Sequence, residues 1–134
     1  MGESLHFAGM NLEHKERKII YKNCIDACFD CVKACDRCAN EGCKISKECT
    51  YGHDCASVCA EVCNLVGRLT ARGHCCSDLY ELCAKYCDEC AKKCEKIEHE
   101  YAKACAAAAK KCAEACRVCK ADCEKCDKEK RAVC

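Results

Sequence analysis

The chain has 134 residues, the size of a single domain, and its 23 Lys and Arg nearly balance its 22 Asp and Glu. A net charge of +1 excludes the strong electrostatic attraction that binding to nucleic acid or to an acidic membrane surface needs. Cysteine accounts for 23 residues, whereas there are two Phe and no Trp. Either the thiols form the core of the fold, or the core is what they bind.

The N-terminus, MGESLHFAGM, has no basic segment followed by an apolar stretch, so we expect no export signal. No apolar run approaches the roughly 18 residues of a transmembrane helix. These features predict a cytoplasmic protein whose thiols stay reduced and available to metals. Residues 1–10 are expected to be a disordered extension.

The first predicted helix covers residues 11–40, and no proline interrupts it or any later helix. Its cysteines are 4, 3, 4 and 3 residues apart, which at about 100° per residue places them on one stripe. They are Cys24, Cys28, Cys31, Cys35 and Cys38. Lys33 and Arg37 lie on the opposite face, and Gly42 and Gly52 flank the break that follows.

The second predicted helix covers residues 53–71 and the third covers 75–98, with Gly67 and Gly73 marking the break between them. The second helix has three cysteines four residues apart, Cys55, Cys59 and Cys63. The third repeats the 4, 3, 4 spacing and has one more cysteine seven residues earlier. These residues are Cys76, Cys83, Cys87, Cys90 and Cys94.

The fourth predicted helix covers residues 100–127, and the charged tail 128–134 is expected to fray. Its cysteines again follow the stripe spacing: Cys105, Cys112, Cys116, Cys119, Cys123 and Cys126. Four such helices with short connections predict an all-α fold, an antiparallel up-down four-helix bundle over residues 11–127. Cysteine occupies the seam positions where leucine would normally lie, so the core should be lined with cysteine.

Thiolates four residues apart are neighbours on one helix face, with Cβ atoms about 5–6 Å apart, so two of them can converge on one ion. Cu(I) is a soft ion that prefers thiolate ligands. The candidate pairs are Cys24/Cys28, Cys31/Cys35, Cys55/Cys59, Cys83/Cys87, Cys90/Cys94, Cys112/Cys116 and Cys119/Cys123. One Cu⁺ per thiolate leaves the core neutral, whereas Zn²⁺ in four-thiolate sites leaves buried negative charge, which is costly. Cysteines that act only as small hydrophobic residues, or as disulfides within the stripes, are the structural alternatives.

Three segments, CIDACFDCVKACDRC (24–38), LCAKYCDECAKKC (82–94) and CAEACRVCKADC (112–123), resemble those of the bacterial copper storage proteins, in particular the cytosolic branch. This resemblance implies a four-helix bundle that stores many Cu(I) ions, often as a homotetramer. It also implies thiolate ligands at the matching cysteines and histidines near one open end. The longer N-terminal extension, the vicinal Cys75-Cys76 pair and the single histidine, His99, between the third and fourth helices depart from the family pattern.

The predicted metal ligands are the cysteines of the four stripes, two cysteines after the first stripe, and two histidines. In chain order they are Cys24, Cys28, Cys31, Cys35, Cys38, Cys43, Cys49, His53, Cys55, Cys59, Cys63, Cys76, Cys83, Cys87, Cys90, Cys94, His99, Cys105, Cys112, Cys116, Cys119, Cys123 and Cys126. Copper is expected to enter at the end that holds Cys43, Cys49, His53 and His99, although both histidines could instead be solvated loop residues. The opposite end gathers an apolar plug of Ile20, Tyr21, Val62, Val66, Leu69 and Leu79.

The predicted function is storage and detoxification of multiple Cu(I) ions, with no copper donor or acceptor identifiable. A zinc or cadmium buffer of the metallothionein type is an alternative, although such chains need no helical periodicity. An iron–sulfur electron carrier is another, because Cys28/Cys31 and Cys87/Cys90 form CxxC pairs, but cluster motifs normally lie on loops. No nucleophile, base and orienting group cluster in the sequence, so we expect no enzyme.

Overall fold

The computed structural model describes residues 9–42 and 49–133, and it describes side chains for residues 15–41 and 54–126. This part of the chain forms four α-helices: α2 (Gly9–Arg37), α4 (Cys49–Ala71), α5 (Ser77–Glu95) and α6 (Glu100–Val133). A short π-helix, η1 (Cys38–Gly42), continues α2. No strand occurs within these two ranges.

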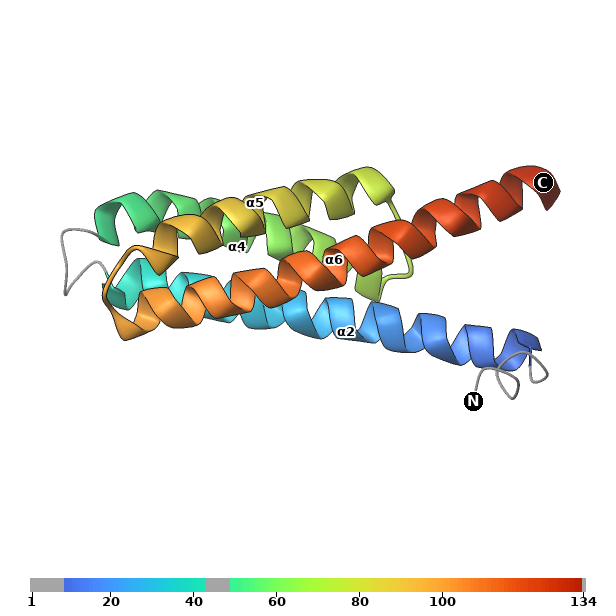
Figure 1. Ribbon diagram of the computed structural model, residues 1–134, viewed down its shortest axis with the longest axis horizontal. Helices are drawn as coiled ribbons and strands as arrows, with labels where there is room; N and C mark the ends of the chain where they lie inside the picture. The colour runs from blue at the N-terminus through green and yellow to red at the C-terminus, as the bar shows by residue number, and fades with distance from the viewer. Residues whose placement is uncertain (1–8, 43–48, 134) are drawn as a thin grey trace.

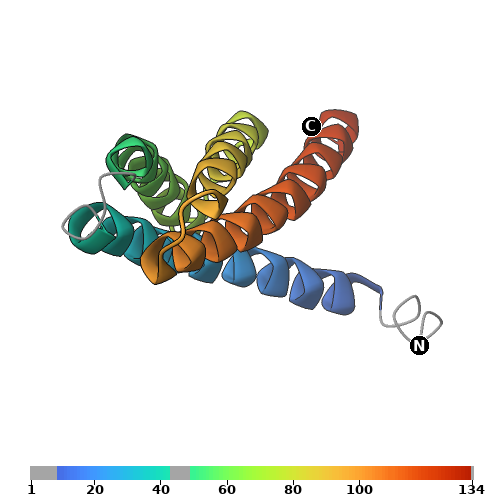
Figure 2. The same ribbon diagram turned by 60° about the vertical axis from the view of Figure 1, so that its left-hand side comes forward.

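The four helices run alternately up and down, side by side (Figure 1). Contacts join α2 to α4, α4 to α5, α5 to α6 and α6 to α2, so consecutive helices are neighbours and the last helix returns to the first. The predicted antiparallel up-down bundle is therefore confirmed. The start of α2 and the end of α6 extend past the α4–α5 connection and diverge there (Figures 1 and 2).

Two glycines that the sequence assigned to breaks lie inside α4. This helix begins at Cys49 and contains both Gly52 and Gly67. The physical reason is clear for Gly67, where a Cβ atom would come within 3.0 Å of the Cys28 Cβ and 3.2 Å of the Phe29 ring. Glycine at this position therefore lets α4 pack closely against α2.

Helix ends also differ from the predicted bounds. Gly73, with a φ of 86°, does follow a helix, and this left-handed conformation favours glycine. The last helix is described to Val133, and the fraying predicted for residues 128–134 stays a prediction. The segment contains helix formers and neither Gly nor Pro, so nothing local stops the helix. Most of the expected disordered extension, residues 1–8, lies outside the described residues.

The core consists of sulfur and small side chains, which confirms the expected cysteine lining. Alanines such as Ala56, Ala109 and Ala113 are buried between the cysteines. Tyr80 and Val66 are the largest fully buried side chains among the described residues. No helix in the described ranges is long and apolar enough to cross a membrane.

Candidate metal centre

Sixteen of the described cysteines are buried, and they come from all four helices and from η1. They are Cys24, Cys28, Cys31, Cys35, Cys38, Cys59, Cys63, Cys83, Cys87, Cys90, Cys94, Cys105, Cys112, Cys116, Cys119 and Cys123. The stripe periodicity of the helices explains this arrangement, because each stripe turns toward the other three. Fifteen of these sixteen are free thiols.

Sulfur atoms of cysteines four residues apart lie close together, as the spacing predicts. The Sγ atoms are 4.0 Å apart in Cys24/Cys28, 3.7 Å in Cys31/Cys35 and 3.9 Å in Cys90/Cys94. Sulfur–sulfur contacts between different helices are equally short, which the spacing within one helix does not predict. The Sγ atoms of Cys35 and Cys105, for example, are 3.4 Å apart although 70 residues separate them in sequence.

Two cysteines at the centre of the bundle join several helices. The Cys63 sulfur lies 3.5 Å from that of Cys87, 3.8 Å from that of Cys83 and 3.7 Å from that of Cys112. Cys112 in turn donates a hydrogen bond to Cys28 at 3.6 Å. Sulfurs from α2, α4, α5 and α6 therefore meet at one level of the core.

Five groups of thiols have all their sulfur atoms within 4.8 Å of one another. They are Cys28/Cys83/Cys112/Cys116, Cys31/Cys63/Cys87/Cys112, Cys31/Cys35/Cys59, Cys35/Cys90/Cys105 and Cys38/Cys94/Cys105. Each group shares one cysteine with the next: Cys112, then Cys31, then Cys35, then Cys105. The groups thus form a continuous chain of sulfur along the bundle.

This spacing suits metal ligation. Metal–thiolate bonds of about 2.3 Å place two ligand sulfurs about 3.8 Å apart around a tetrahedral ion and about 4.6 Å apart across a linear one. The sulfur contacts range from 3.4 to 4.0 Å, so shifts of less than about an ångström would admit either arrangement. Shared cysteines would let a thiolate bridge two ions.

The electrostatics of the core require cations from outside the protein. Thr70 is the one buried polar or charged residue among those described, so no buried Lys or Arg side chain balances the thiolates. Hydrogen bonds to Cys116 and Cys28, together with burial, raise the pKa of Cys112 well above its usual range. Hydrogen bonds from Cys105 and Cys35 lower the pKa of Cys90 to about 5. A metal entering this network therefore has to displace protons from most of the thiols.

The end of the bundle at the α5–α6 connection, called here the His99 end, carries the last sulfur group. The half-buried His99 ring stacks on Tyr101 at 5.1 Å, and its Nδ1 accepts a hydrogen bond from the Tyr101 backbone N–H at 3.2 Å. His99 is also close enough to the Cys38 thiol to interact with its charge. Positions 43 and 49 and His53, which were predicted to lie here, fall outside the described side chains.

The opposite end, at the α4–α5 connection, is called here the Cys75 end. Val66 is 1% exposed, whereas Leu69 and Leu79 are only half-buried. Sequence reasoning missed Tyr80, which is 1% exposed and whose hydroxyl group is 2.8 Å from that of Thr70. Its position three residues before Cys83, on the stripe of the third helix, was the available signal.

Three predicted ligands are not fully buried and belong to none of the five sulfur groups. Cys76 is exposed at the start of α5, and Cys55 and Cys126 are half-buried. Cys123 is buried, but a disulfide joins its sulfur to that of Cys75, with the Cα atoms 6.2 Å apart. The ligand role predicted for Cys123 stays a prediction for the reduced protein. The bond links the α4–α5 connection to α6 and does not lie within a stripe, so the spacing of the stripes gave no sign of it.

Comparison with known proteins identifies relatives that bind copper or belong to a copper storage family. The sequence model of the Csp family, described as copper storage protein, matches residues 17–133. The Cu(I)-bound copper storage protein BsCsp3 is 31% identical, with a TM-score of 0.71, over 75% of this chain and 98% of that chain. Apo-Csp3 from Bacillus subtilis is also 31% identical, with a TM-score of 0.67, over 74% of this chain and 97% of that one. No curated protein sequence matches the chain.

Proposed function

The chain belongs to the copper storage protein family, and we propose that it stores and detoxifies copper by holding multiple Cu(I) ions along its sulfur core. The observation that carries this proposal is the chain of five thiol groups, each sharing a cysteine with the next. Soft thiolate ligands select Cu(I). A shared thiolate can bridge two ions, so capacity can approach one ion per core cysteine.

Charge balance favours Cu(I) over Zn²⁺ in this core. One Cu⁺ per thiolate neutralises the sulfur chain, and no Lys or Arg side chain is buried with it among the described residues. Zn²⁺ in separate four-thiolate sites would leave two negative charges per site, and uncompensated buried charge is strongly destabilising. The ions would displace the thiol protons as they bind.

Copper is proposed to load at the His99 end. The Cys38/Cys94/Cys105 group lies there, and the charge of His99 interacts with the Cys38 thiol. The Cys75 end is closed by Tyr80, Thr70 and Val66. Imidazole and thiolate are both copper ligands, so this end can capture an ion and pass it to the next sulfur group. Cys43, Cys49 and His53 would belong to the same entrance.

We also propose the compartment in which the protein works and expect that it does not act as an enzyme. A free-thiol core needs a reducing compartment, which supports a cytoplasmic location. We expect no catalytic activity, because the proposed role uses the thiols as ligands. The CxxC pairs Cys28/Cys31 and Cys87/Cys90 lie inside α2 and α5, which disfavours an iron–sulfur electron carrier.

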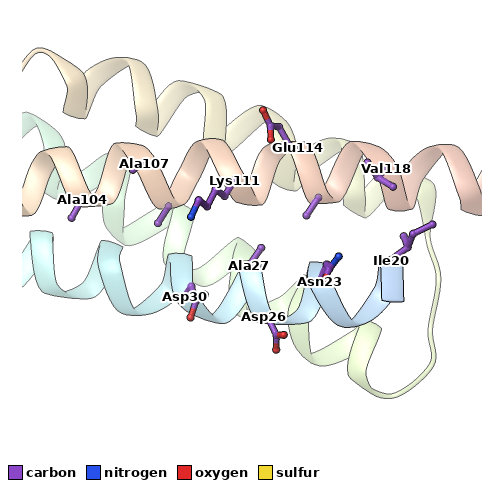
Figure 3. Close-up of a pocket in the computed structure, with 12 residues that line it drawn as sticks. Ile20, Asn23, Asp26, Ala27, Asp30, Ala104, Ala107, Lys111, Glu114 and Val118 are labelled. Atoms are coloured by element: carbon purple, nitrogen blue, oxygen red, sulfur yellow. The ribbon is translucent and has the colours of Figure 1, made fainter. Parts of the chain in front are cut away.

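A groove between α2 and α6 supports self-association, for which we propose a homotetramer. Figure 3 shows this groove, which small α6 residues such as Ala104 and Ala107 line. Ile20 and Val118 border it, and Val118 is 50% exposed. Small side chains let a helix of a second copy approach closely. Analytical ultracentrifugation should show association that an Ala107→Glu variant weakens.

Metal competition tests the proposed function against a zinc or cadmium buffer. Reduced protein is first saturated with Zn²⁺ under anaerobic conditions and then given one Cu(I) per cysteine. We expect Cu(I) to displace nearly all the zinc and to bind in larger number than the zinc it replaces. Zinc that stays bound, or a copper count no higher than the zinc count, would support the buffer instead.

A further inference from the structure

The two adjacent cysteines of the α4–α5 connection have different surroundings. Cys75 and Cys76 are both exposed, and neither belongs to the five sulfur groups of the core. Cys75 lines a surface groove beside α2 and α6. Cys76 is not among the described lining residues of that groove and instead borders a small pocket with Tyr80. Two neighbouring thiols can therefore be compared, of which only Cys75 lines the groove.

Cys75 lies opposite Cys123 of α6. Their Cα atoms are 6.2 Å apart, which is about the separation of two residues four apart on an α-helix. Cysteines four apart in the core have their sulfurs 3.7 to 4.0 Å apart. In the reducing compartment proposed for this protein, Cys75 and Cys123 are thiols. Two thiols with this Cα separation can converge on one Cu(I), since linear ligation places the sulfurs about 4.6 Å apart.

A third thiol and a carboxylate lie beside this pair. The Tyr21 hydroxyl group is 3.4 Å from the Cys75 sulfur and donates a hydrogen bond to Asp122 Oδ2 at 2.7 Å. The Cys126 sulfur is 4.0 Å from the same Asp122 oxygen, and Cys126 lines the groove together with Cys75. Because Cys123 and Cys126 are three residues apart on α6, they lie on one face of that helix.

The groove wall supplies positive charge, which the core lacks. Arg17, Lys18 and Lys22 line the groove, and no carboxylate residue is among its described lining residues. Arg17 Nε is 3.4 Å from Asp122, and Lys22 Nζ is 2.8 Å from Asp26, so these cations are partly balanced. A Cu(I) ion with two thiolates carries a single negative charge, which nearby cationic side chains stabilise. A separate ion held by two thiolates therefore suits the groove, whereas the core favours one ion per thiolate.

From this geometry we propose a second copper site at the surface, in which Cys75 and Cys123 hold one Cu(I) in the groove. Cys126 lies beside them as a third thiol of the cluster. The proposal rests on the copper storage function for the identity of the metal, and the site is separate from the five sulfur groups. Cu(I) displaces the two thiol protons to solvent as it binds. Because Cys75 is exposed, ligands in solution reach this ion directly.

The first experiment measures whether copper protects Cys75 from alkylation. Reduced apoprotein and copper-loaded protein are treated anaerobically with iodoacetamide, and modification of each cysteine is followed by peptide mass mapping. Copper should slow alkylation of Cys75 by about tenfold or more, because a thiolate bound to metal is not free to react, and it should leave Cys76 nearly unchanged. Equal protection of the two thiols, or no protection of Cys75, would overturn the site.

Copper per chain is counted in the same samples, which separates this site from the store. A protein that holds only a few ions and yet protects Cys75 would contradict storage and support the surface site. Cys123→Ser should abolish the protection of Cys75, because the second ligand is lost. Cys76→Ser is the matched control and should retain that protection. Protection that survives Cys123→Ser would refute the proposed ligand pair.

The second experiment tests the cationic wall with a variant that keeps both ligands. In Lys18→Gln/Lys22→Gln, a Cu(I) chelator should remove the protection of Cys75 at about tenfold lower concentration than in wild type, because two stabilising positive charges are gone. Lys33→Gln removes a cation that pairs with Asp30 elsewhere on α2, and it should behave like wild type. The same chelator concentration for all three proteins would contradict the proposed charge balance of the site.

Discussion

The half-buried Cys55 links the protonation of a thiol to the stability of the apoprotein. Burial is the main cause that raises its pKa from 9.0 to about 12. Because the folded-state pKa lies above the unfolded value, this thiol's contribution to stability is complete below pH 9 and is lost as pH rises through about 12. The contribution of Cys55 to the free energy of unfolding therefore depends on pH only under alkaline conditions.

We predict that the free energy of unfolding of the reduced apoprotein falls between about pH 9 and pH 12. The free energy of unfolding of the Cys55→Ala variant should fall less steeply over the same range, because this variant lacks one of the thiols that ionise on unfolding. Denaturant titrations of both proteins at several pH values measure this difference. Identical pH slopes in the two proteins would contradict the assignment.

His99 is placed to influence loading without setting capacity. Its Nδ1 is occupied by the Tyr101 backbone N–H, so ligation through that atom requires the ring to leave this hydrogen bond. We predict that His99→Ala takes up Cu(I) from a competing chelator more slowly than wild type and reaches the same final copper count. Stopped-flow loading measures the rate. An unchanged rate would remove His99 from the path, and a lower final count would make it a storage ligand.

At the scale of helices, the close contact between α2 and α4 depends on Gly67. Alanine has a helix propensity about 1 kcal/mol better than glycine. Its Cβ would, however, come within 3.0 Å of the Cys28 Cβ, which cannot rotate away, and overpacking a core costs typically about 1–3 kcal/mol.

We therefore predict that Gly67→Ala lowers the free energy of unfolding by about 1 kcal/mol, and by up to about 2 kcal/mol. Glu61→Ala, at an exposed position of the same helix, should change it by less than about 0.5 kcal/mol. Denaturant unfolding of the reduced apoproteins provides the values. A Gly67→Ala protein more stable than wild type would mean that α2 and α4 can move apart at no cost in the free energy of unfolding.

The helices themselves could be predicted because a 4, 3 repeat of one residue type is a direct signal of helical periodicity. The positions where helices begin and end were less predictable. Gly52 and Gly67 looked like breaks, yet the glycine at 67 is required by the approach of another helix. That requirement comes from tertiary packing, which a local pattern does not contain.

The sulfur groups likewise depend on tertiary packing, which the sequence pattern does not contain. Sequence spacing predicted pairs within a helix, such as Cys31/Cys35, but the meeting of Cys31, Cys63, Cys87 and Cys112 depends on how four helices are shifted along their axes. The Cys75–Cys123 bond depends in addition on the path of the α4–α5 connection. Its only sign in the sequence is the vicinal Cys75-Cys76 pair.

At the scale of the whole molecule, the helices form a sheath around a continuous chain of sulfur. Lys, Arg, Asp and Glu lie on the outer faces, where pairs such as Lys120 with Glu81 join α6 to α5. Such exposed pairs contribute little to stability. Metal binding is therefore proposed to act on stability through the core, where each ion would displace protons, neutralise a thiolate and join helices through bridging sulfur.

A sulfur chain that acts as one large store should bind copper in proportion to the number of its core thiols. Reduced protein is titrated with Cu(I) under anaerobic conditions, and copper and protein are quantified in the same fraction after gel filtration. We predict saturation near one ion per buried cysteine, of which the described residues of the reduced protein contain sixteen. Saturation at a handful of ions, about one for every four thiolates, would contradict the account, because it would show isolated tetrahedral sites in place of a shared chain.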